Sequence, residues 1–397
     1  SFRLTREQLL ADLHQAYLDA RRHKRQKSYQ QHFERHAEAN LQHLCDELWT
    51  RTYQPQPATC FIITDPKRRE VFAAQFRDRI IHHLYYNYVH EMLERTFIQD
   101  SYSCIKHRGT HYGINRLERH IRRESQNYQF PCYVLKMDIS GYFMHIDRNR
   151  LFNIVIKQLE AMSAHHVEKG KAERWEDRVD MPFVEWPSRV IIFQNVAKDC
   201  CRRGSLLDWY GLPHDKSLFH SAPDCGLPIG NLTSQLFSNV YMNEFDQYMK
   251  RSLCCRHYGR YVDDFFVVSC DRNWLLGLQG PIMEFLSVRL GLKINNGKTL
   301  LCDVRQGVEF LGAFLKPHRH YVRSSTMNRM KRKVLALVDC DSPYAVRSRL
   351  NSMLGLLSYH RSYYLRRKLF SHLPHVHLWG YFLVGMRKYV FYPSLSL

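Results

Sequence analysis

The chain has 397 residues, 45% of them hydrophobic and 13% aromatic, which excludes an intrinsically disordered protein because such chains are poor in aromatic side chains. Its 58 Lys and Arg outnumber its 38 Asp and Glu, and the formal net charge of +20 predicts a polyanionic partner, most often nucleic acid. Because no uncharged apolar run reaches about 18 residues and residues 1–10 lack an apolar signal core, we expect no membrane association and no secretion.

The cysteines and histidines do not form a metal or disulfide pattern. Twelve cysteines are scattered without a CxxC spacing, so we expect free thiols in a reducing cytosol. His372, His375 and His377 have no cysteine at ligand spacing, which favours a solvated or RNA-facing segment over a metal site.

Two amphipathic helices are predicted in the N-terminal section. The pair Thr5 and Gln8 resembles a capping box, and apolar residues then recur at helical spacing. A second apolar run ends before Pro55 and Pro57. Beyond it, the hydrophobic pattern predicts a strand at 59–65 and helices at 71–98 and 113–123.

The middle of the chain alternates short apolar runs with helices. Residues 131–138 read as a buried strand that ends in Asp138, and residues 256–270 read as a hairpin with Asp263 and Asp264 in its turn. The charged stretch 163–181 is expected to be a solvated loop or a frayed helix. Further elements are predicted as helices at 147–159, within 226–249 and at 281–290, and as strands at 292–294 and 308–315.

The C-terminal part is basic and helical. Residues 311–397 hold 15 basic and two acidic side chains, whereas residues 136–310 hold 22 basic and 21 acidic ones. From Ser324 onward the apolar residues recur at helical spacing. The order of elements therefore predicts an α+β protein in which a small antiparallel sheet carries acidic residues and basic helices follow.

Three carboxylates stand where they can carry chemistry. Adjacent strands can bring Asp138, Asp263 and Asp264 within a few ångströms, and clustered carboxylates repel one another unless cations neutralise them. Hard oxygen ligands favour Mg²⁺, and two such ions about 3.5–4 Å apart can activate an attacking oxygen and stabilise a leaving one. The alternative is that the Asp-Asp pair is only a turn, since Asp favours turns.

The segment Tyr261-Val262-Asp263-Asp264, flanked by β-rich runs, resembles the Tyr-x-Asp-Asp signature of reverse transcriptases. Other segments resemble the blocks of that family in the same order: 66–69 with 76–81, 100–102 with 108–109, 136–143, 291–299 and 310–312. The resemblance covers roughly residues 59–315 and implies a right-hand polymerase fold. It implies an N-terminal helical extension at 1–58, fingers at 59–135, a palm at 136–315 with a charged insertion at about 160–225, and a helical basic thumb at 316–397.

Residues 228–235 carry a signal of the subfamily. Most reverse transcriptases have Gln-Gly-x-x-x-Ser-Pro in this block, whereas this chain has Ile229 in place of the Gln and Gln235 in place of the Pro. This form is similar to the reverse transcriptases of diversity-generating retroelements, which are bacterial or phage enzymes related to those of group II introns. The resemblance implies copying of a template RNA into cDNA, with errors at template adenines, for mutagenic retrohoming.

Two other functions stay open. One is another bacterial reverse transcriptase, of the phage-defence or group II intron type. The other is a non-catalytic RNA-binding relic of the same fold, against which the intact Asp138, Asp263 and Asp264 argue.

The resemblance also implies roles for the acidic residues. Asp138 and Asp263 are expected to bind two Mg²⁺ ions, with Mn²⁺ as a substitute, while Asp264 supports them and the carbonyl of Ile139 adds a ligand. Lys298 matches a lysine proposed to protonate the leaving pyrophosphate, and its alternative is a surface lysine.

The expected dNTP site has a charged and an apolar part. Lys67 and Arg69 would clamp the triphosphate, and their alternative is a solvated basic turn. Phe143 stands where the family places a ring that excludes a 2′-hydroxyl, and its alternative is a core residue.

The remaining dNTP-site residues lie in the subfamily block. Ile229 lacks the hydrogen bonds of a Gln, which predicts low fidelity, although a packing Ile in an accurate enzyme is the alternative. Gly230 permits a close backbone approach, and Gln235 is expected to hold this loop through its amide.

The expected partners are the template RNA, the cDNA/RNA hybrid, dNTPs and an oligomer of a basic accessory variability protein. A cytoplasmic location in a bacterial cell, with a phage or prophage origin as an option, follows from the same resemblance. The residues expected to bind nucleic acid are Arg108, Tyr261, Lys331, Arg332, Lys333, Arg366 and Arg367.

Overall fold

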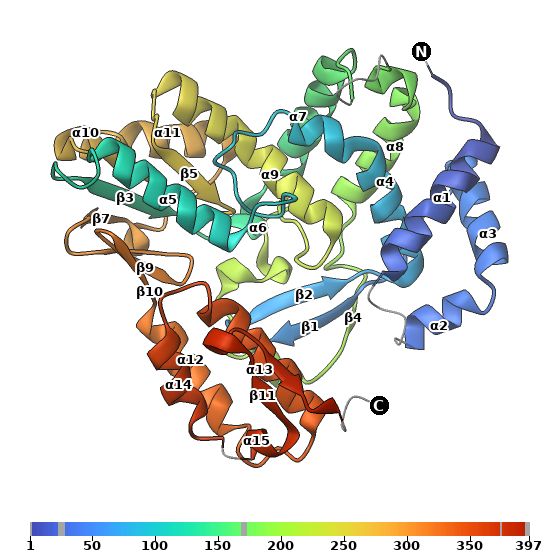
Figure 1. Ribbon diagram of the computed structural model, residues 1–397. Helices are drawn as coiled ribbons and strands as arrows, with labels where there is room; N and C mark the ends of the chain where they lie inside the picture. Colours follow the sequence, from blue (N-terminus) through green and yellow to red (C-terminus); the bar gives the residue numbers. More distant parts are fainter. Residues whose placement is uncertain (1, 23–27, 168–172, 374, 394–397) are drawn as a thin grey trace. The chain divides into compact units, whose positions relative to one another are not determined.

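The structure is a computed structural model that describes residues 2–22, 28–167, 173–373 and 375–393 (Figure 1). The chain divides into two compact units, each described by itself. Unit 1 comprises Ser1–Lys106, Met137–Phe265 and Gly277–Thr299, and unit 2 comprises His107–Lys136, Phe266–Leu276 and Leu300–Leu397. Helices and strands are both abundant, so the predicted α+β fold class is confirmed. The four-part division into extension, fingers, palm and thumb stays a prediction.

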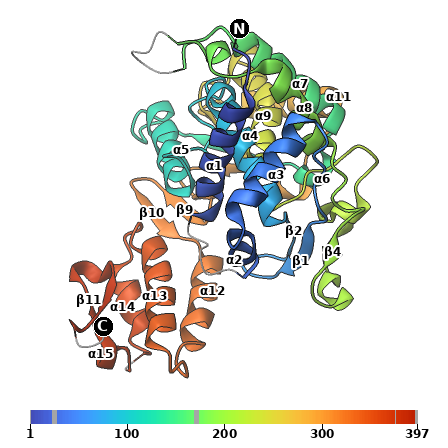
Figure 2. The ribbon, with the colours of Figure 1, turned by 90° about the vertical axis from the view of Figure 1, so that its right-hand side faces the viewer.

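Unit 1 begins with three helices where the pattern predicted two: α1 (Arg6–Arg21), α2 (Ser28–Glu34) and α3 (Ala37–Trp49). The predicted cap of α1 is present, because the Thr5 hydroxyl accepts a hydrogen bond from the backbone N of Gln8 at 3.1 Å. The buried face of α1, which includes Leu9 and Leu13, packs against α3 and against α4 (Phe76–Glu94) in one apolar cluster (Figure 2).

A small sheet precedes α4. Strands β1 (Thr59–Ile63) and β2 (Arg69–Ala73) are antiparallel, and β4 (Cys201–Arg202) runs parallel to β1 on its other edge. The predicted helix over 71–98 was therefore wrong at both ends. Residues 71–73 pair with residues 59–61 as a strand, and the helix runs only from Phe76 to Glu94.

The other α-helices of unit 1 surround a long central one. Helix α9 (Leu232–Gln247) is buried on nearly every side and packs against α4 and α7, as expected for a helix in a protein core. Helix α7 (Arg148–Met162) and helix α11 (Gln279–Leu290) contact α9, and α8 (Met181–Phe193) contacts α7 and α4. The short helix α6 (Tyr142–His145) also belongs to this unit.

Short turns complete the backbone. The predicted solvated loop at 163–181 lies partly outside the described residues, and its described part includes Trp175, which is buried and donates from Nε1 to the Tyr88 carbonyl at 2.8 Å. The described 3₁₀ and π turns are η1 (Trp175–Asp177), η2 (Leu206–Trp209), η3 (His214–Lys216), η4 (Leu218–His220), η5 (Tyr248–Ser252), η6 (Asn296–Lys298) and η7 (Val384–Met386).

The sheet that carries the acidic residues has four strands in the order β5-β6-β3-β7. They are β5 (Tyr258–Tyr261), β6 (Asp264–Ser269), β3 (Tyr133–Asp138) and β7 (Leu300–Asp303). The turn between β5 and β6 was expected at Asp263-Asp264, but it consists of Val262 and Asp263, and Asp264 already belongs to β6. The strand predicted at 292–294 is absent from this described stretch except for one bridge between Ile294 and Ile139.

Unit 2 contains α5 (Thr110–Glu124), α10 (Arg272–Gly277) and a three-stranded sheet in the order β10-β9-β8. The single strand predicted at 308–315 is two strands, because Leu311 and Gly312 adopt left-handed conformations and turn the chain back. The sheet strands are β8 (Val308–Phe310), β9 (Ala313–Lys316) and β10 (Arg319–Val322).

The C-terminal part of unit 2 has its own core. Helices α12 (Ser324–Leu335), α13 (Pro343–Leu357) and α14 (Tyr363–Phe370) enclose it with α15 (Val376–Trp379), as the helical pattern predicted. A hairpin of β11 (Gly380–Phe382) and β12 (Tyr389–Phe391) was not predicted, and it contributes the buried Tyr389 to that core. Over the described residues, none of the helices has the length and apolarity needed to cross a membrane.

Candidate active site

The three predicted carboxylates lie at the ends of neighbouring strands. Asp138 is the last residue of β3, Asp263 lies in the β5–β6 turn and Asp264 starts β6. The backbone ties these segments together, because the N–H of Ile139 donates to the carbonyl of Asp263 at 3.2 Å and the N–H of Asn295 donates to that of Asp138 at 2.7 Å. The carboxyl-bearing segments are therefore held by hydrogen bonds between residues far apart in sequence.

The carboxylates affect one another electrostatically. Burial, together with the negative charges of Asp138 and Asp264, raises the pKa of Asp263 to about 6, although the positive charge of Lys298 acts in the opposite direction. Crowded carboxylates with a raised pKa are typical of sites that act on charged substrates or bind cations.

Lys298 joins the same cluster. It ends the η6 turn, and its Nζ lies 2.6 Å from Oδ2 of Asp138. Although burial acts in the opposite direction, the hydrogen bond and the charge of Asp138 raise the pKa of the Lys298 ammonium. A raised pKa keeps the ammonium protonated at neutral pH, so this side chain holds a proton beside the carboxylates.

The donor chemistry of the cluster fits Mg²⁺. Oxygen atoms of carboxylates and of the Ile139 carbonyl are the hard ligands that this ion prefers. A divalent cation would relieve the carboxylate repulsion that, after burial, contributes to the raised pKa of Asp263. In the part of the chain that the structure describes, no three acidic, His or Cys side chains are grouped closely enough to hold a metal ion, and the ammonium of Lys298 lies on Asp138.

The predicted triphosphate clamp lies on the β1–β2 hairpin. Lys67 is exposed in the connection between the strands, and Arg69 is exposed at the start of β2, where it pairs with Ile63. The next residue, Glu70, is buried and was not predicted to matter. Its carboxylate accepts hydrogen bonds from Trp209 Nε1 (2.7 Å), Ser217 Oγ (3.0 Å) and the backbone N of Leu218 (2.7 Å).

Glu70 therefore connects the segment 209–218, which precedes α9, to the strand that carries Arg69. Sequence reasoning missed this role because a single Glu in a basic cluster looks like a solvated charge. A weak signal was present in the alternation along β2, where Glu70 and Phe72 face the buried side.

The predicted apolar part of the dNTP site is brought together. Phe143 and Ile229 pack against one buried cluster that includes Phe72 and Met144. The carbonyl of Ile229 accepts a hydrogen bond from the N–H of Phe72 at 2.8 Å. Gly230 has φ +124°, and a Cβ there would lie 2.9 Å from the Phe72 carbonyl oxygen, so the β2 backbone admits only a glycine without displacement.

One further acidic residue, Asp215, contacts the backbone segment that follows Asp138 and Ile139. The hydroxyl of Ser140 donates to Oδ2 of Asp215 at 3.4 Å, and a Cβ on Gly141 would lie 2.5 Å from the Asp215 carbonyl oxygen. The sequence offered no signal for Asp215 because it lies in a turn-rich insertion without periodicity. The segment around Asp215 thus contacts Ser140, the residue that follows Ile139.

Three further residues that were predicted to contact nucleotide or nucleic acid lie on or beside β5, α9 and α5. Tyr261 is half-buried at the end of β5, and Gln235 is exposed on α9, where its backbone carbonyl accepts from Ser238 Oγ at 2.9 Å. Arg108 is half-buried just before α5 in unit 2. Their predicted contacts with nucleotide and nucleic acid stay predictions.

The basic residues of unit 2 separate into two groups. Lys331, Arg332 and Lys333 are exposed on α12, and Arg367 is exposed on α14. Arg366 differs, because it is buried and its Nη1 donates to the Met386 carbonyl at 2.8 Å. Burial, followed by the charge of Arg387, lowers its pKa, and contact with RNA would require the guanidinium to leave this position.

Solved structures similar to this chain include two telomerases. That of Candida albicans, in complex with a TWJ fragment of telomeric RNA, is 13% identical with a TM-score of 0.45, and apo telomerase of Candida tropicalis is 12% identical with a TM-score of 0.47. Each comparison covers 81% of this chain but only 55% and 57% of the telomerase chains. Structural similarity at this level is too low to indicate a function for this chain.

Sequence comparison gives a more specific result. Protein YkfC of Escherichia coli (strain K12) is 24% identical over 306 residues, which cover 68% of this chain and 70% of that protein. Residues 188–315, which include the Tyr261–Asp264 segment, match the family described as "Reverse transcriptase (RNA-dependent DNA polymerase)". The α+β fold is consistent with the predicted right-hand polymerase, and residues 188–315 resemble a reverse transcriptase domain.

Proposed function

We propose that this protein is an RNA-directed DNA polymerase that copies a template RNA into cDNA. The observation that carries the proposal is the carboxylate cluster at the strand ends, where the backbone of Ile139 joins Asp138 to Asp263, and burial together with the charge of Asp138 raises the pKa of Asp263. This cluster includes the Tyr-x-Asp-Asp segment of the matched domain. Such crowding is useful to an enzyme that must hold cations and phosphates together.

The residues divide the work of phosphoryl transfer. Asp138, Asp263 and the Ile139 carbonyl would hold Mg²⁺, with Asp264 in support, and the bound ion would neutralise the charge that develops on the phosphate oxygens. Lys298 holds a proton at Nζ, which it can give to the pyrophosphate that leaves after the primer 3′-hydroxyl attacks the α-phosphate.

The surrounding residues select the substrate. Lys67 and Arg69 bind the triphosphate from the β1–β2 hairpin, since a guanidinium matches phosphate geometry and an ammonium supplies a mobile charge. Phe143 excludes a 2′-hydroxyl and so favours dNTPs. Its packing against the same cluster as Ile229 supports a common nucleotide pocket.

We further propose a diversity-generating retroelement as the setting. Ile229 cannot make the hydrogen bonds of the Gln found in most reverse transcriptases, and a site without polar readout discriminates less between bases. The proposed partners are template RNA, the cDNA/RNA hybrid and an oligomer of a basic accessory protein, in the cytoplasm of a bacterial cell. An accurate bacterial reverse transcriptase of another type is the second candidate.

Sequencing of the product tests both levels of the proposal. The purified protein, given a primed RNA template, dNTPs and Mg²⁺ or Mn²⁺, should make cDNA, and Asp263→Asn should make none while it still binds the RNA. Errors should concentrate at template adenines and should become fewer in Ile229→Gln. Accurate wild-type cDNA would contradict the retroelement setting, and cDNA from Asp263→Asn would contradict the assigned site.

A further inference from the structure

A buried ion pair lies directly behind the turn that carries Asp263. Arg260 of β5 is 1% exposed and Asp246 of α9 is fully buried. The guanidinium binds both carboxylate oxygens, with Nε 2.8 Å from Oδ1 and Nη2 2.7 Å from Oδ2. The hydroxyl of Tyr258 donates to Oδ1 of the same carboxylate at 2.6 Å, so Asp246 is firmly held.

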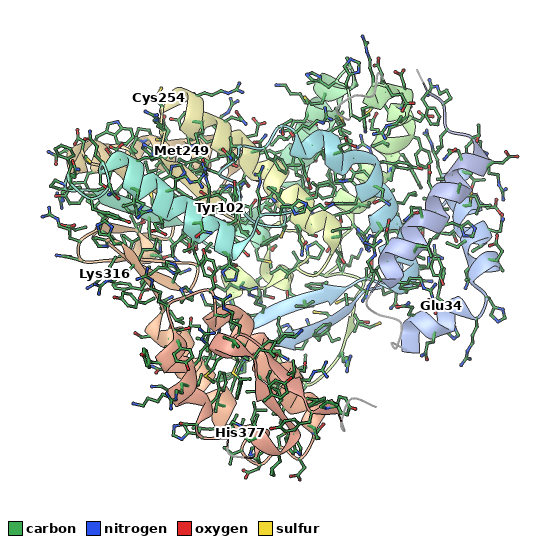
Figure 3. All side chains as sticks on the ribbon, viewed as in Figure 1. Glu34, Tyr102, Met249, Cys254, Lys316 and His377 are labelled. Carbon is green, nitrogen blue, oxygen red and sulfur yellow. The ribbon has the colours of Figure 1, made fainter. Side chains whose placement is uncertain are left out.

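The remaining donors of Arg260 extend beyond this pair. Nη1 donates to the backbone carbonyl of Val262 at 2.8 Å and to Oδ1 of Asn239 at 3.4 Å, while Nη2 donates to Ser101 Oγ at 3.2 Å. The backbone of Arg260 is paired as well, since the N–H of Tyr102, which is labelled in Figure 3, donates to its carbonyl at 3.0 Å. The hydrogen bonds thus fix the position of the Arg260 guanidinium, and its Nη1 contacts the β5–β6 turn at Val262.

Val262 is an unusual residue for its position. Its φ of +57° lies in the left-handed region, which a β-branched side chain adopts only rarely. Backbone strain of this kind persists only when the surrounding structure holds it. The hydrogen bond from Arg260 to the Val262 carbonyl supplies such a hold.

Asp263 is consequently fixed on both sides. The peptide group that precedes it contains the Val262 carbonyl bound by Arg260, and its own carbonyl accepts the hydrogen bond from Ile139. With both flanking peptides restrained, the direction of the Asp263 side chain is set by the backbone. A buried ion pair is weak evidence for stability, because desolvation offsets the attraction between its charges.

We propose that Arg260 is a positioning residue: with Asp246 as its anchor, it holds the left-handed Val262 peptide and thereby aims the Asp263 carboxylate. This inference rests on the proposed function in one respect, namely that Asp263 is catalytic. Arg260 itself touches no reacting atom in this scheme.

Arg260→Lys tests the proposal, because an ammonium retains the charge opposite Asp246 but cannot span Asp246 and the Val262 carbonyl together. We expect kcat for dNTP incorporation to fall by about 10²-fold, the loss that small misplacements cause. KM for dNTP should change by less than about threefold. Hydrogen exchange of the 261–265 backbone should become faster than in the wild type.

Tyr258→Phe is the matched control. It removes a hydrogen bond from the same buried Asp246 but leaves the contact between Arg260 and Val262 in place. We expect this variant to lose thermal stability while kcat and the exchange of 261–265 stay at wild-type values. A purely structural role of Arg260 would instead make kcat follow the unfolding temperature in both variants.

A second variant keeps the test informative if Arg260→Lys folds poorly. Val262→Gly removes the cost of the left-handed conformation, so the double variant Arg260→Lys/Val262→Gly should recover part of the lost kcat. The proposal is overturned if Arg260→Lys keeps kcat within twofold of wild type, if exchange at 261–265 is unchanged, or if the glycine gives no recovery. A wild-type protein without polymerase activity would contradict the proposed function, while the exchange measurement would still decide the role of Arg260.

Discussion

The buried charges near the acidic turn and hairpin of unit 1 differ in their role from the exposed charges of α12 in unit 2. Unit 1 buries Glu70, Asp246 and Arg260. Glu70 and Asp246 each accept three hydrogen bonds, and the guanidinium of Arg260 donates at least three. Unit 2 exposes Lys331 and Arg332 on α12, in a segment with 15 basic and two acidic residues. Buried charges fix geometry because desolvation makes any loss of a partner costly, whereas exposed charges act at a distance and are screened by salt.

We expect substitutions of the two sets of charges to differ in the size and in the salt dependence of their effects. Changes to the paired charges of unit 1 should have large effects that salt hardly alters. Changes to the exposed charges of unit 2 should have small, nearly additive effects that depend steeply on salt. The following experiments test this difference between the two sets of charges.

The largest effect is expected at Asp138. Asp138→Asn removes a charge that Asp263 and Lys298 both face, and nucleotide incorporation should fall on the order of 10²–10³-fold or more. Primer-extension rates at 50 and 300 mM salt should show the same relative loss. Glu284→Gln, at an exposed position of unit 1, is the control and should keep the wild-type rate. A loss that disappears at high salt would contradict a local role.

The exposed charges of α12 should affect RNA binding through salt. Replacing Lys331, Arg332 and Lys333 with Gln should reduce the slope of log affinity against log salt by about 0.7–0.9 for each phosphate contact that is lost. Titrations of a primed RNA template between 50 and 200 mM salt measure this slope.

Three exposed basic residues of unit 1 (Arg22, Lys157 and Arg189) provide the control for that experiment. Their replacement by Gln should leave the slope close to that of the wild type. Equal slopes for the α12 variant and the wild type would place the RNA-binding surface elsewhere.

Glu70→Gln should destabilise unit 1. Leu218 N donates to one carboxylate oxygen, and Trp209 and Ser217 donate to the other, so either orientation of an amide opposes its NH₂ to a donor. The free energy of unfolding should fall by about 1–3 kcal/mol. Denaturant titrations at low and high salt should give the same loss, and a strongly salt-dependent loss would show that Glu70 behaves as a surface charge.

The effect that is smallest at neutral pH is a pH dependence within unit 2. Burial, followed by the charges of His320 and His111, lowers the pKa of His360 from 6.5 to about 4, and its Nδ1 lies 2.9 Å from that of His320. Between pH 6.5 and 4 the unfolded chain therefore binds more protons than the folded chain. The contribution of the neutral His360 to the free energy of unfolding is fully present above pH 6.5 and is lost as the pH falls toward 4. The loss should reach up to about 1.4 kcal/mol per pH unit.

A substitution at this position tests the assignment. His360→Phe should flatten the decline of the unfolding free energy between pH 6.5 and 4.5, whereas the exposed His372→Asn should leave it unchanged. An identical decline in the wild type and in His360→Phe would mean that other groups cause it.

Local patterns allowed much of the fold to be predicted. The Thr5 cap, the strand that ends in Asp138 and the hairpin that carries Asp263 and Asp264 depend on neighbouring residues and were predicted from sequence. Residues 71–73 were misassigned because Val71 and Phe72 fit a helical stripe as well as a strand, and only the pairing with β1 decides between them. The split of 308–315 depended on a turn at Leu311 and Gly312 that hydrophobicity does not reveal.

Sequence patterns were enough to predict the candidate site residues: three carboxylates at strand ends, a basic C-terminal segment and an apolar Ile229 where most reverse transcriptases have Gln. They were enough because strand and turn preferences, charge and motif order are properties of short segments. The contacts that fix the positions of these residues could be identified only in the tertiary structure. The contacts of Glu70 with the insertion and of Arg260 with Asp246 and Val262 join side chains from separate elements, and burial turns otherwise ordinary charges into fixed geometry.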